Sequence, residues 1–257
     1  MENSLNLHQR VALIAGPMSS TVSSIVMGLT RLGADCVLLD PDKTVASAFI
    51  NQINDSREIN DRYGRANVIQ SPLKTQEDLK DAVGRAAQTF GGLDIYIDAF
   101  MIQQPTPINF EKMFDGLDNL LERSLKTPLM LTQNVLAYMK ARKKGRVIFL
   151  MNESPSSKIK EDVLGTGVRS GLLQFASALA KQTADFNVTV NSMSVALTEE
   201  YILAHDPESK SIKEAMEKMK ALDPSLKITE PDKISQTVSF LVSPMGATMN
   251  GQHFRLS

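Results

Sequence analysis

Residues 11–24 read VALIAGPMSSTVSS, an apolar run that leads into a short polar loop, and IVMGLTRLG (25–33) follows with a helical pattern. A strand, a tight loop and a helix at the front of an α/β chain usually form a dinucleotide-binding loop, whose glycines let the backbone approach a pyrophosphate. Here Gly16 stands at the turn, but serines, a threonine and a valine follow it. The stretch predicts an α/β fold and leaves open whether the loop still holds a cofactor.

Short β-rich runs alternate with longer helical patterns along the whole chain. Several of these runs are apolar almost throughout, which is typical of parallel strands covered on both faces. The expected strands are 10–15, 35–40, 67–70, 94–98, 146–151, 187–193 and 252–256. This alternation predicts a doubly wound parallel sheet of about seven strands with helices on both faces. Because no internal repeat or linker interrupts it, we expect one domain over 1–257.

Two of the intervening segments have a clear helical pattern. The segment 75–90 opens with Thr75 followed by Asp78, which resembles a capping box with aspartate in place of the usual glutamate. In the segment 170–184, we expect one apolar stripe, made of Leu173, Ala176, Leu179 and Ala180.

The segment 197–230 breaks the alternation because it is charged and contains the helical pattern SIKEAMEKMKAL. An insertion after the sixth strand lies at the carboxyl edge of the sheet, where ligands bind in this architecture. We therefore expect a lid or substrate loop here, with Met216 and Met219 as packing residues of its helix.

The composition excludes several classes of function. The 257 residues include 28 basic and 29 acidic side chains, so no net charge points to nucleic acid or to an acidic membrane. Cys36 is the only cysteine, which rules out an internal disulfide, and His8, His205 and His253 lack metal-ligand spacing. The first residues do not have the pattern of a signal peptide, and no apolar stretch is long enough to span a membrane. The sequence predicts a soluble, cytoplasmic protein.

The chain resembles the short-chain dehydrogenase/reductase family over nearly its whole length. The motifs that carry the resemblance are VALIAG (11–16), GGLDIYID (91–98), GRVIFLM (145–151), NVTVNSMS (187–194) and the C-terminal segment 228–252. The resemblance implies a Rossmann-type sheet and a tetramer built through two long helices, here about 110–142 and 165–184. The most similar group within the family is the 3-oxoacyl-(acyl-carrier-protein) reductases.

The residues that perform catalysis in this family are replaced here. The resemblance implies a tyrosine as proton donor, a lysine four residues later, a serine that orients substrate and an asparagine on the preceding long helix. In this sequence Gly165 stands at the tyrosine position, Arg169 at the lysine, Asn152 at the serine and Ser124 at the asparagine. Glycine supplies no acid, and the pKa of an arginine is too high for proton transfer. No catalytic residue is therefore expected at these four positions.

The cofactor motifs have changed as well. The family loop Thr-Gly-x-x-x-Gly-x-Gly has Ala15, Gly16, Ser20 and Val22 at its defined positions, and the turn Asn-Asn-Ala-Gly has become 98–101, Asp-Ala-Phe-Met. We expect the last two residues of that turn, Phe100 and Met101, to put bulk near the usual place of the adenosine.

Two features of the loop region allow more than one interpretation. Asp40 ends the second strand, where an acid would bind a ribose hydroxyl and favour NAD, but it is equally a turn residue before Pro41. Ser19 and Ser20 could hold an anion at the start of the helix, although ordinary capping of that helix is the preferred interpretation.

The changes together predict a protein that has kept the fold and lost hydride transfer. Such a pseudoenzyme would be a scaffold, a ligand sensor or a partner subunit, either in a homo-oligomer (dimer or tetramer) or paired with an active relative. A competing interpretation is an NAD(P)-dependent ketoacyl or enoyl reductase that uses other groups, with Asn152, Glu153, Arg169 and His205 as candidates. A third keeps weak NAD binding through Gly16, Ser19, Ser20 and Asp40 without turnover; otherwise no cofactor is expected, and no metal, nucleic acid or membrane partner.

Overall fold

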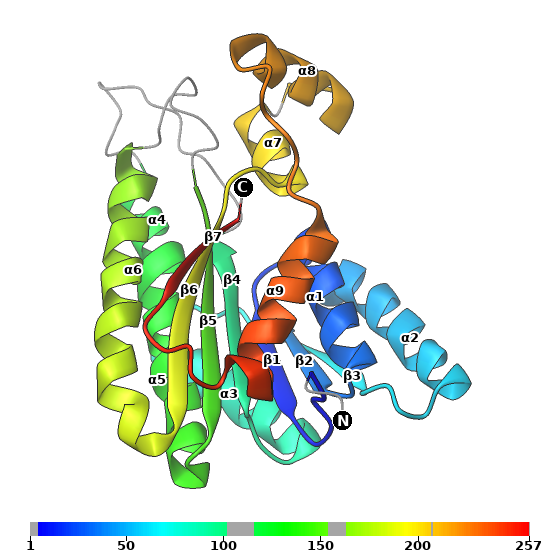
Figure 1. The fold of residues 1–257 in the computed structure, drawn as a ribbon, viewed down its shortest axis with the longest axis vertical. Coiled ribbons are helices and arrows are strands. Elements are labelled where there is room, and N and C mark those ends of the chain that lie inside the picture. Colours follow the sequence, from blue (N-terminus) through cyan, green and yellow to red (C-terminus); the bar gives the residue numbers. More distant parts are fainter. Residues whose placement is uncertain (1–4, 102–115, 154–162, 207, 257) are drawn as a thin grey trace.

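A computed structural model describes residues 5–101, 116–153, 163–206 and 208–256. Its centre is one seven-stranded sheet with the order β3-β2-β1-β4-β5-β6-β7, in which every neighbouring pair is parallel (Figure 1). The strands are β1 (Val11–Ala15), β2 (Asp35–Asp40), β3 (Ala66–Gln70), β4 (Ile95–Met101), β5 (Gly145–Asn152), β6 (Val188–Val195) and β7 (His253–Leu256). The predicted doubly wound α/β fold is confirmed.

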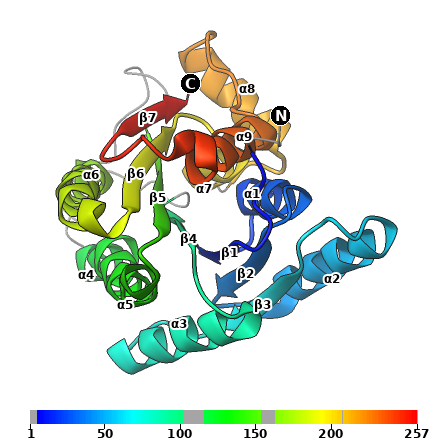
Figure 2. The same cartoon turned by 60° about the horizontal axis from the view of Figure 1, so that its bottom comes forward.

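Helices cover both faces of this sheet, as Figure 2 shows. One face carries α1 (Ser20–Arg31), α2 (Lys43–Ile59) and α9 (Pro231–Val242). The other carries α3 (Gln76–Phe90), α4 (Leu117–Leu121), α5 (Thr127–Arg142) and α6 (Val163–Thr183). Two further helices, α7 (Glu199–His205) and α8 (Ile212–Leu222), lie beyond the carboxyl ends of the strands, on the side of α1 and α9 (Figure 1).

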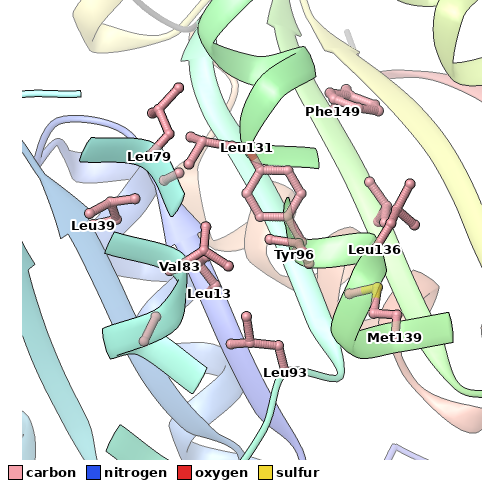
Figure 3. Packing of buried hydrophobic residues seen from close by; sticks show 14 of the residues in the cluster. Leu13, Leu39, Leu79, Val83, Leu93, Tyr96, Leu131, Leu136, Met139 and Phe149 are labelled. Carbon is pink, nitrogen blue, oxygen red and sulfur yellow. The ribbon is translucent and has the colours of Figure 1, made fainter. Parts of the chain in front are cut away.

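The sheet separates two apolar cores because successive strand residues point to opposite faces. Leu13, Tyr96 and Phe149 are fully buried on the face of α3, α5 and α6. Figure 3 shows them near leucines of α3 and α5, namely Leu79, Leu131 and Leu136. Their strand neighbours Ile14 and Ile97 are fully buried on the face of α1 and α9. Burial on both faces explains why the strand sequences are apolar almost throughout.

The predicted start of the helix at 75–90 is confirmed in detail. Thr75 Oγ1 accepts a hydrogen bond from the backbone N–H of Asp78 at 3.1 Å, and the Asp78 carboxylate accepts one from the N–H of Thr75 at 3.0 Å. This reciprocal pair satisfies two donors that the first turn cannot bond internally. The helix ends at Gly91, whose φ of 84° is the left-handed geometry that terminates helices.

The second of the two long helices, expected at about 165–184, is α6, whereas the first differs from expectation. The first begins, within the described residues, as α4, and a π-helical turn (Glu122–Lys126) joins it to α5; residues 110–115 lie outside the description. On α6 the predicted stripe is only partly correct. Ala176 and Ala180 are buried, but Leu172 is buried in place of Leu173, and Leu179 is half-buried beside a groove between α5 and α6. A helix packed against both a sheet and a neighbouring helix turns a wider face inward than a single stripe suggests.

The helices α7 and α8 have a small apolar cluster of their own. It contains Leu197, Tyr201, Ile202, Ala215, Met216, Met219 and Leu226. The expectation that Met216 and Met219 are packing residues is confirmed, since both are buried there. Cys36 is buried in β2 as a core residue, and burial raises the pKa of its thiol. None of the helices in the described ranges is long and apolar enough to cross a membrane.

Gly16 makes the turn out of β1 and has no room for a side chain. Its φ is 149°, and a Cβ there would lie 3.0–3.1 Å from atoms of Ala99. We expect Gly16→Ala to lower the free energy of unfolding by about 1–3 kcal/mol because alanine is strained in this conformation. Urea denaturation followed by circular dichroism measures the change.

Gly171→Ala is the matched control, because Gly171 is exposed on α6 and a Cβ there meets no atom within 4 Å. Alanine in a helix is expected to leave stability unchanged or raise it by up to about 1 kcal/mol. Equal unfolding midpoints for the two variants would show that the turn tolerates a side chain.

Candidate functional site

The carboxyl edge of the sheet between β1 and β4 is the place where this architecture binds ligands. The strand order reverses there, because β2 and β3 lie on one side of β1 and the strands from β4 onward lie on the other. Gly16 follows β1, and Asp98 lies in the last part of β4. The two loops and the first turn of α1 therefore border the same crevice.

The first turn of α1 is capped by the loop itself. Ser19 is the N-cap residue, and its Oγ accepts a hydrogen bond from the backbone N–H of Val22 at 3.1 Å. Capping by Ser19, the preferred interpretation of its role, is what the structure shows. Val22, at the position of the third family glycine, is buried in the core beneath α1. Its side chain therefore stabilises the helix on the sheet.

A carboxylate from α7 bonds to the same turn. Glu200 Oε1 accepts hydrogen bonds from Ser20 Oγ at 2.9 Å and from the backbone N–H of Thr21 at 3.1 Å. Glu200 Oε2 accepts a third bond from Thr21 Oγ1 at 3.3 Å. Ser20 thus bonds an anion rather than capping the helix, and that anion belongs to the protein.

The environment of Glu200 keeps its carboxylate ionised. Desolvation by burial is the largest single effect and raises the pKa of Glu200, but hydrogen bonds from the backbone N–H groups of Thr21 and Glu200 and from two hydroxyls outweigh it. The net pKa lies below the ordinary glutamate value. Sequence analysis did not single out Glu200, because an acid in the first turn after Thr198 has the ordinary pattern of a helix start.

Asp40 has the geometry of a residue in a strand-end turn. Its Oδ2 accepts a hydrogen bond from the backbone N–H of Met18 at 2.9 Å, and its Oδ1 accepts one from the backbone N–H of Asp42 at 2.8 Å. Only 2% of its surface is exposed. Burial raises the pKa of Asp40, and these two hydrogen bonds oppose the rise. The carboxylate braces the loop after β1 from the end of β2.

The structure brings together only some of the four residues that the sequence predicts at the family's catalytic positions. Asn152, at the end of β5, and Arg169, on α6, line one cavity of about 150 Å³. The Arg169 guanidinium donates a hydrogen bond to Thr166 Oγ1 at 2.5 Å. Gly165 is buried one turn earlier on α6, and Ser124 is buried in the π-helical turn before α5. Neither Gly165 nor Ser124 lines this cavity.

A histidine that sequence analysis left unassigned lines this cavity too. His253, on β7, lies with its Nδ1 2.9 Å from Ser192 Oγ and its Nε2 3.2 Å from Ser194 Oγ. Burial lowers the pKa of His253, with Glu153 raising it and Arg255 lowering it. Glu153 and Arg255 form an ion pair beside it. Only the parallel pairing of β7 with β6 creates this arrangement, so no local sequence pattern could have indicated it.

The tyrosines lie elsewhere in the structure. Tyr96 is buried in the core of the α3–α5–α6 face, and Tyr201 is buried in the α7–α8 cluster. Tyr138 is on α5 and lines a groove beside α3, and Tyr63 is in the turn before β3. In the described part of the chain, none of the four lines the cavity that holds Asn152 and Arg169.

The turn at the end of β4 contains a buried acid. Asp98 is fully buried, and desolvation raises its pKa to about 7, although a hydrogen bond from the backbone N–H of Phe100 opposes the rise. Phe100 packs against the core on the α3–α5–α6 face. The ring thus contributes to that core, while the side chain of Met101 lies outside the description. Within the described residues, no group of histidine, cysteine and acidic side chains could hold a metal ion.

The sheet order, the loop after β1 and the crevice at the carboxyl edge define a Rossmann-type protein of an oxidoreductase family. Residues 19–256 match the family model described as enoyl-(acyl carrier protein) reductase. The chain belongs to the short-chain dehydrogenase/reductase family, as its motifs predict.

Relatives match the chain over nearly its full length. It is 24% identical to the uncharacterized oxidoreductase YvaG of Bacillus subtilis, over 98% of this chain and 96% of that protein. It is 22% identical to the 3-oxoacyl-[acyl-carrier-protein] reductase FabG of Aquifex aeolicus, over 96% of each.

Solved structures share the fold. A putative short-chain dehydrogenase/reductase from Burkholderia xenovorans superposes with a TM-score of 0.83 at 18% identity, covering 98% of this chain and 96% of that one. The Pseudomonas aeruginosa RhlG/NADP active-site complex superposes with a TM-score of 0.80, also at 18% identity, covering 100% and 98%.

The buried carboxyl of Asp98 makes stability depend on pH. Because its folded pKa is raised from 3.8 to about 7, the folded state binds a proton that the unfolded state releases between these values. Stability contributed by this proton is present below about pH 4 and is lost as pH rises toward 7. Asp98→Asn removes the titration, so the variant should gain on the order of 2–4 kcal/mol relative to the original chain between pH 4 and pH 8.

Denaturant unfolding of Asp98→Asn and of the original chain, each at pH 4 and at pH 8, measures this difference in the free energy of unfolding. Asp55→Asn, at an exposed position on α2, controls for removal of a carboxylate without burial. A difference between Asp98→Asn and the original chain that stays constant with pH would contradict the raised pKa.

Proposed function

We propose that this chain is a short-chain dehydrogenase/reductase that has lost hydride-transfer catalysis and acts as a pseudoenzyme, as a partner subunit, scaffold or ligand sensor. One observation carries the proposal. The position at which the family places its proton-donating tyrosine is Gly165, buried inside α6, and the cavity beside it is lined by no tyrosine in the described residues. A general acid contributes about 10²–10⁴ in rate, so its absence is expected to lower the rate of hydride transfer by such a factor.

The neighbouring groups support the proposal because they do not replace the acid. Arg169 is bonded to Thr166, and a guanidinium keeps its proton at any physiological pH. The cavity of about 150 Å³ is smaller than the roughly 300–1,000 Å³ of ordinary small-molecule sites. The space beside β5 therefore fits a small polar group better than a nicotinamide together with a substrate.

The residues at the loop do not fit a dinucleotide held in the family's usual way. Glu200 presents a negative charge at the turn that would receive a pyrophosphate, and both oxygens of Asp40 already accept hydrogen bonds. Ser20 stands where the family's second glycine lets the backbone approach the phosphates, and Val22 is buried where the third glycine lets the helix and strand pack closely. These contacts support the view that NAD binds weakly or not at all.

A groove between α5 and α6 supports assembly with a second copy or with an active relative. It has a volume of about 480 Å³, and its apolar lining includes Leu129, Met130, Leu136, Phe175 and Leu179. Two half-buried apolar helices side by side form a surface that another pair of helices can cover.

A second candidate function is a reductase with an unusual proton donor. The observation in its favour is His253, a titratable group that lines the same cavity as Asn152 and Arg169. Its lowered pKa leaves it mainly neutral at pH 7, which makes it a poor acid. The side chain of His205, the other histidine considered, lies outside the description.

Hydride transfer separates these two functions. We expect the purified protein to oxidise neither NADH nor NADPH above background with a panel of ketoacyl and enoyl thioesters, measured by absorbance at the nicotinamide band. Arg169→Ala and His253→Asn should leave that background unchanged. Robust turnover that either variant abolishes would replace the pseudoenzyme by the second candidate.

The mass of the protein particle in solution tests whether the groove between α5 and α6 is an assembly surface. We expect an oligomer whose dissociation is favoured by Leu179→Lys, because a charge in an apolar interface is left unpaired. Leu222→Lys is the control, since Leu222 is 58% exposed on α8, away from this groove. Sedimentation velocity should show a smaller particle for the first variant only, and equal masses for all three proteins would exclude this face as the interface.

A further inference from the structure

The contact between Glu200 and α1 joins two distant parts of the chain at the position where the family's architecture places a cofactor phosphate. Glu200 belongs to α7, and Ser20 and Thr21 begin α1. Three hydrogen bonds of 2.9–3.3 Å connect the carboxylate to this turn, from one backbone N–H and two hydroxyls. A side-chain anion held by an amide and hydroxyls at a helix start has the same bonding as a bound phosphate oxygen.

The first turn of a helix explains why a carboxylate binds there. Its leading N–H groups have no carbonyl partner within the helix, and the aligned peptide dipoles favour negative charge at this end. In α1, Ser19 accepts the bond from Val22 and Glu200 accepts the bond from Thr21. The protein therefore supplies from its own side chains the acceptors that a pyrophosphate supplies in a dinucleotide-binding loop.

We propose that the Glu200 carboxylate takes the place of the cofactor's pyrophosphate at the start of α1. There it excludes a dinucleotide from the groove, and it attaches the α7–α8 segment to α1. The exclusion is both steric and electrostatic. The carboxylate takes the donors that a phosphate would use, and it repels a second anion at short range in a partly desolvated site.

The same contact holds the α7–α8 segment in place. The buried residues of this segment pack in a cluster of their own, which includes Tyr201, Met216 and Met219 and is separate from both cores of the sheet. Figure 1 shows α7 and α8 beyond the carboxyl ends of the strands, with α7 nearer to the sheet than α8. The hydrogen bonds of Glu200 therefore tie a small, separately packed unit to the main body.

This inference rests on the proposed loss of function at the same site, but its test measures anion binding and backbone protection, so the two proposals can fail separately. Glu200→Gln removes the charge and keeps the shape, and Glu200→Ala removes the contact. Glu199→Gln is the matched control, because Glu199 lies in the same turn of α7 and, within the described residues, makes no hydrogen bond or ion pair with α1. Thermal melts establish that each variant is folded.

Titration calorimetry with inorganic pyrophosphate isolates the anion position from the rest of the groove. We expect no saturable binding below about 1 mM for the original chain or for Glu199→Gln. For Glu200→Gln and Glu200→Ala we expect affinity at least about tenfold higher, since charge-assisted hydrogen bonds from the helix start become available. Equal pyrophosphate binding by Glu200→Gln and Glu199→Gln, or micromolar binding of NAD⁺ by the original chain, would overturn the exclusion.

Hydrogen exchange, measured without any ligand, tests whether Glu200 attaches the α7–α8 segment to α1. In Glu200→Ala, exchange of the α7 amides should be about tenfold or more faster than in the original chain. Local opening of α7 then costs less free energy, because the hydrogen bonds of Glu200 do not have to be broken. Exchange in β5, at the centre of the sheet, should be unchanged. Unaltered exchange in α7 would show that the segment is held by other contacts, and would overturn its attachment through Glu200.

Discussion

The unpaired N–H groups at the start of α1 are the constraint on which the carboxyl edge of this protein depends. Every helix begins with donors that its own carbonyls cannot satisfy, and a buried helix start must find acceptors for them. Here the acceptors are Ser19 from the loop and Glu200 from α7. Because these acceptors lie inside the chain, the donors of the turn are satisfied without a ligand, and Val22 is buried as part of the core.

The fold and the candidate site of this protein depend on different residues. The sheet is stabilised by apolar burial on both faces, which Leu13 and Ile14 show within a single dipeptide. None of this burial requires an acid, a base or a cofactor. The side chains at the strand ends are therefore free to vary, and Gly165 and Arg169 share a helix with residues that pack in the core. Membership of the family follows from the match of residues 19–256 to its model, whereas function has to be argued from the site.

Much of this arrangement could be predicted because its causes are local. Apolar runs predicted the seven strands, with ends correct to within a few residues, and the Thr75–Asp78 pair predicted the start of α3. The replacement of the catalytic positions stays a prediction from the sequence, because it depends on aligning family motifs residue by residue. The buried stripe of α6 was only partly correct, since Leu172 and Leu179 are placed by a neighbouring helix as well as by the sheet. The partners of His253 could not be predicted, because strand pairing brings Ser192 and Ser194 to it.

The sequence by itself determined the alternation of strands and helices and the parallel sheet. These properties depend on residue type and on spacing along the chain. Only the tertiary structure decided what lies at the start of α1, because Glu200 and Thr21 are far apart in sequence and meet through the placement of α7 above the sheet edge. The bonding of a carboxylate to a helix start depends on distance and direction in space, and neither is written in the local pattern around either residue.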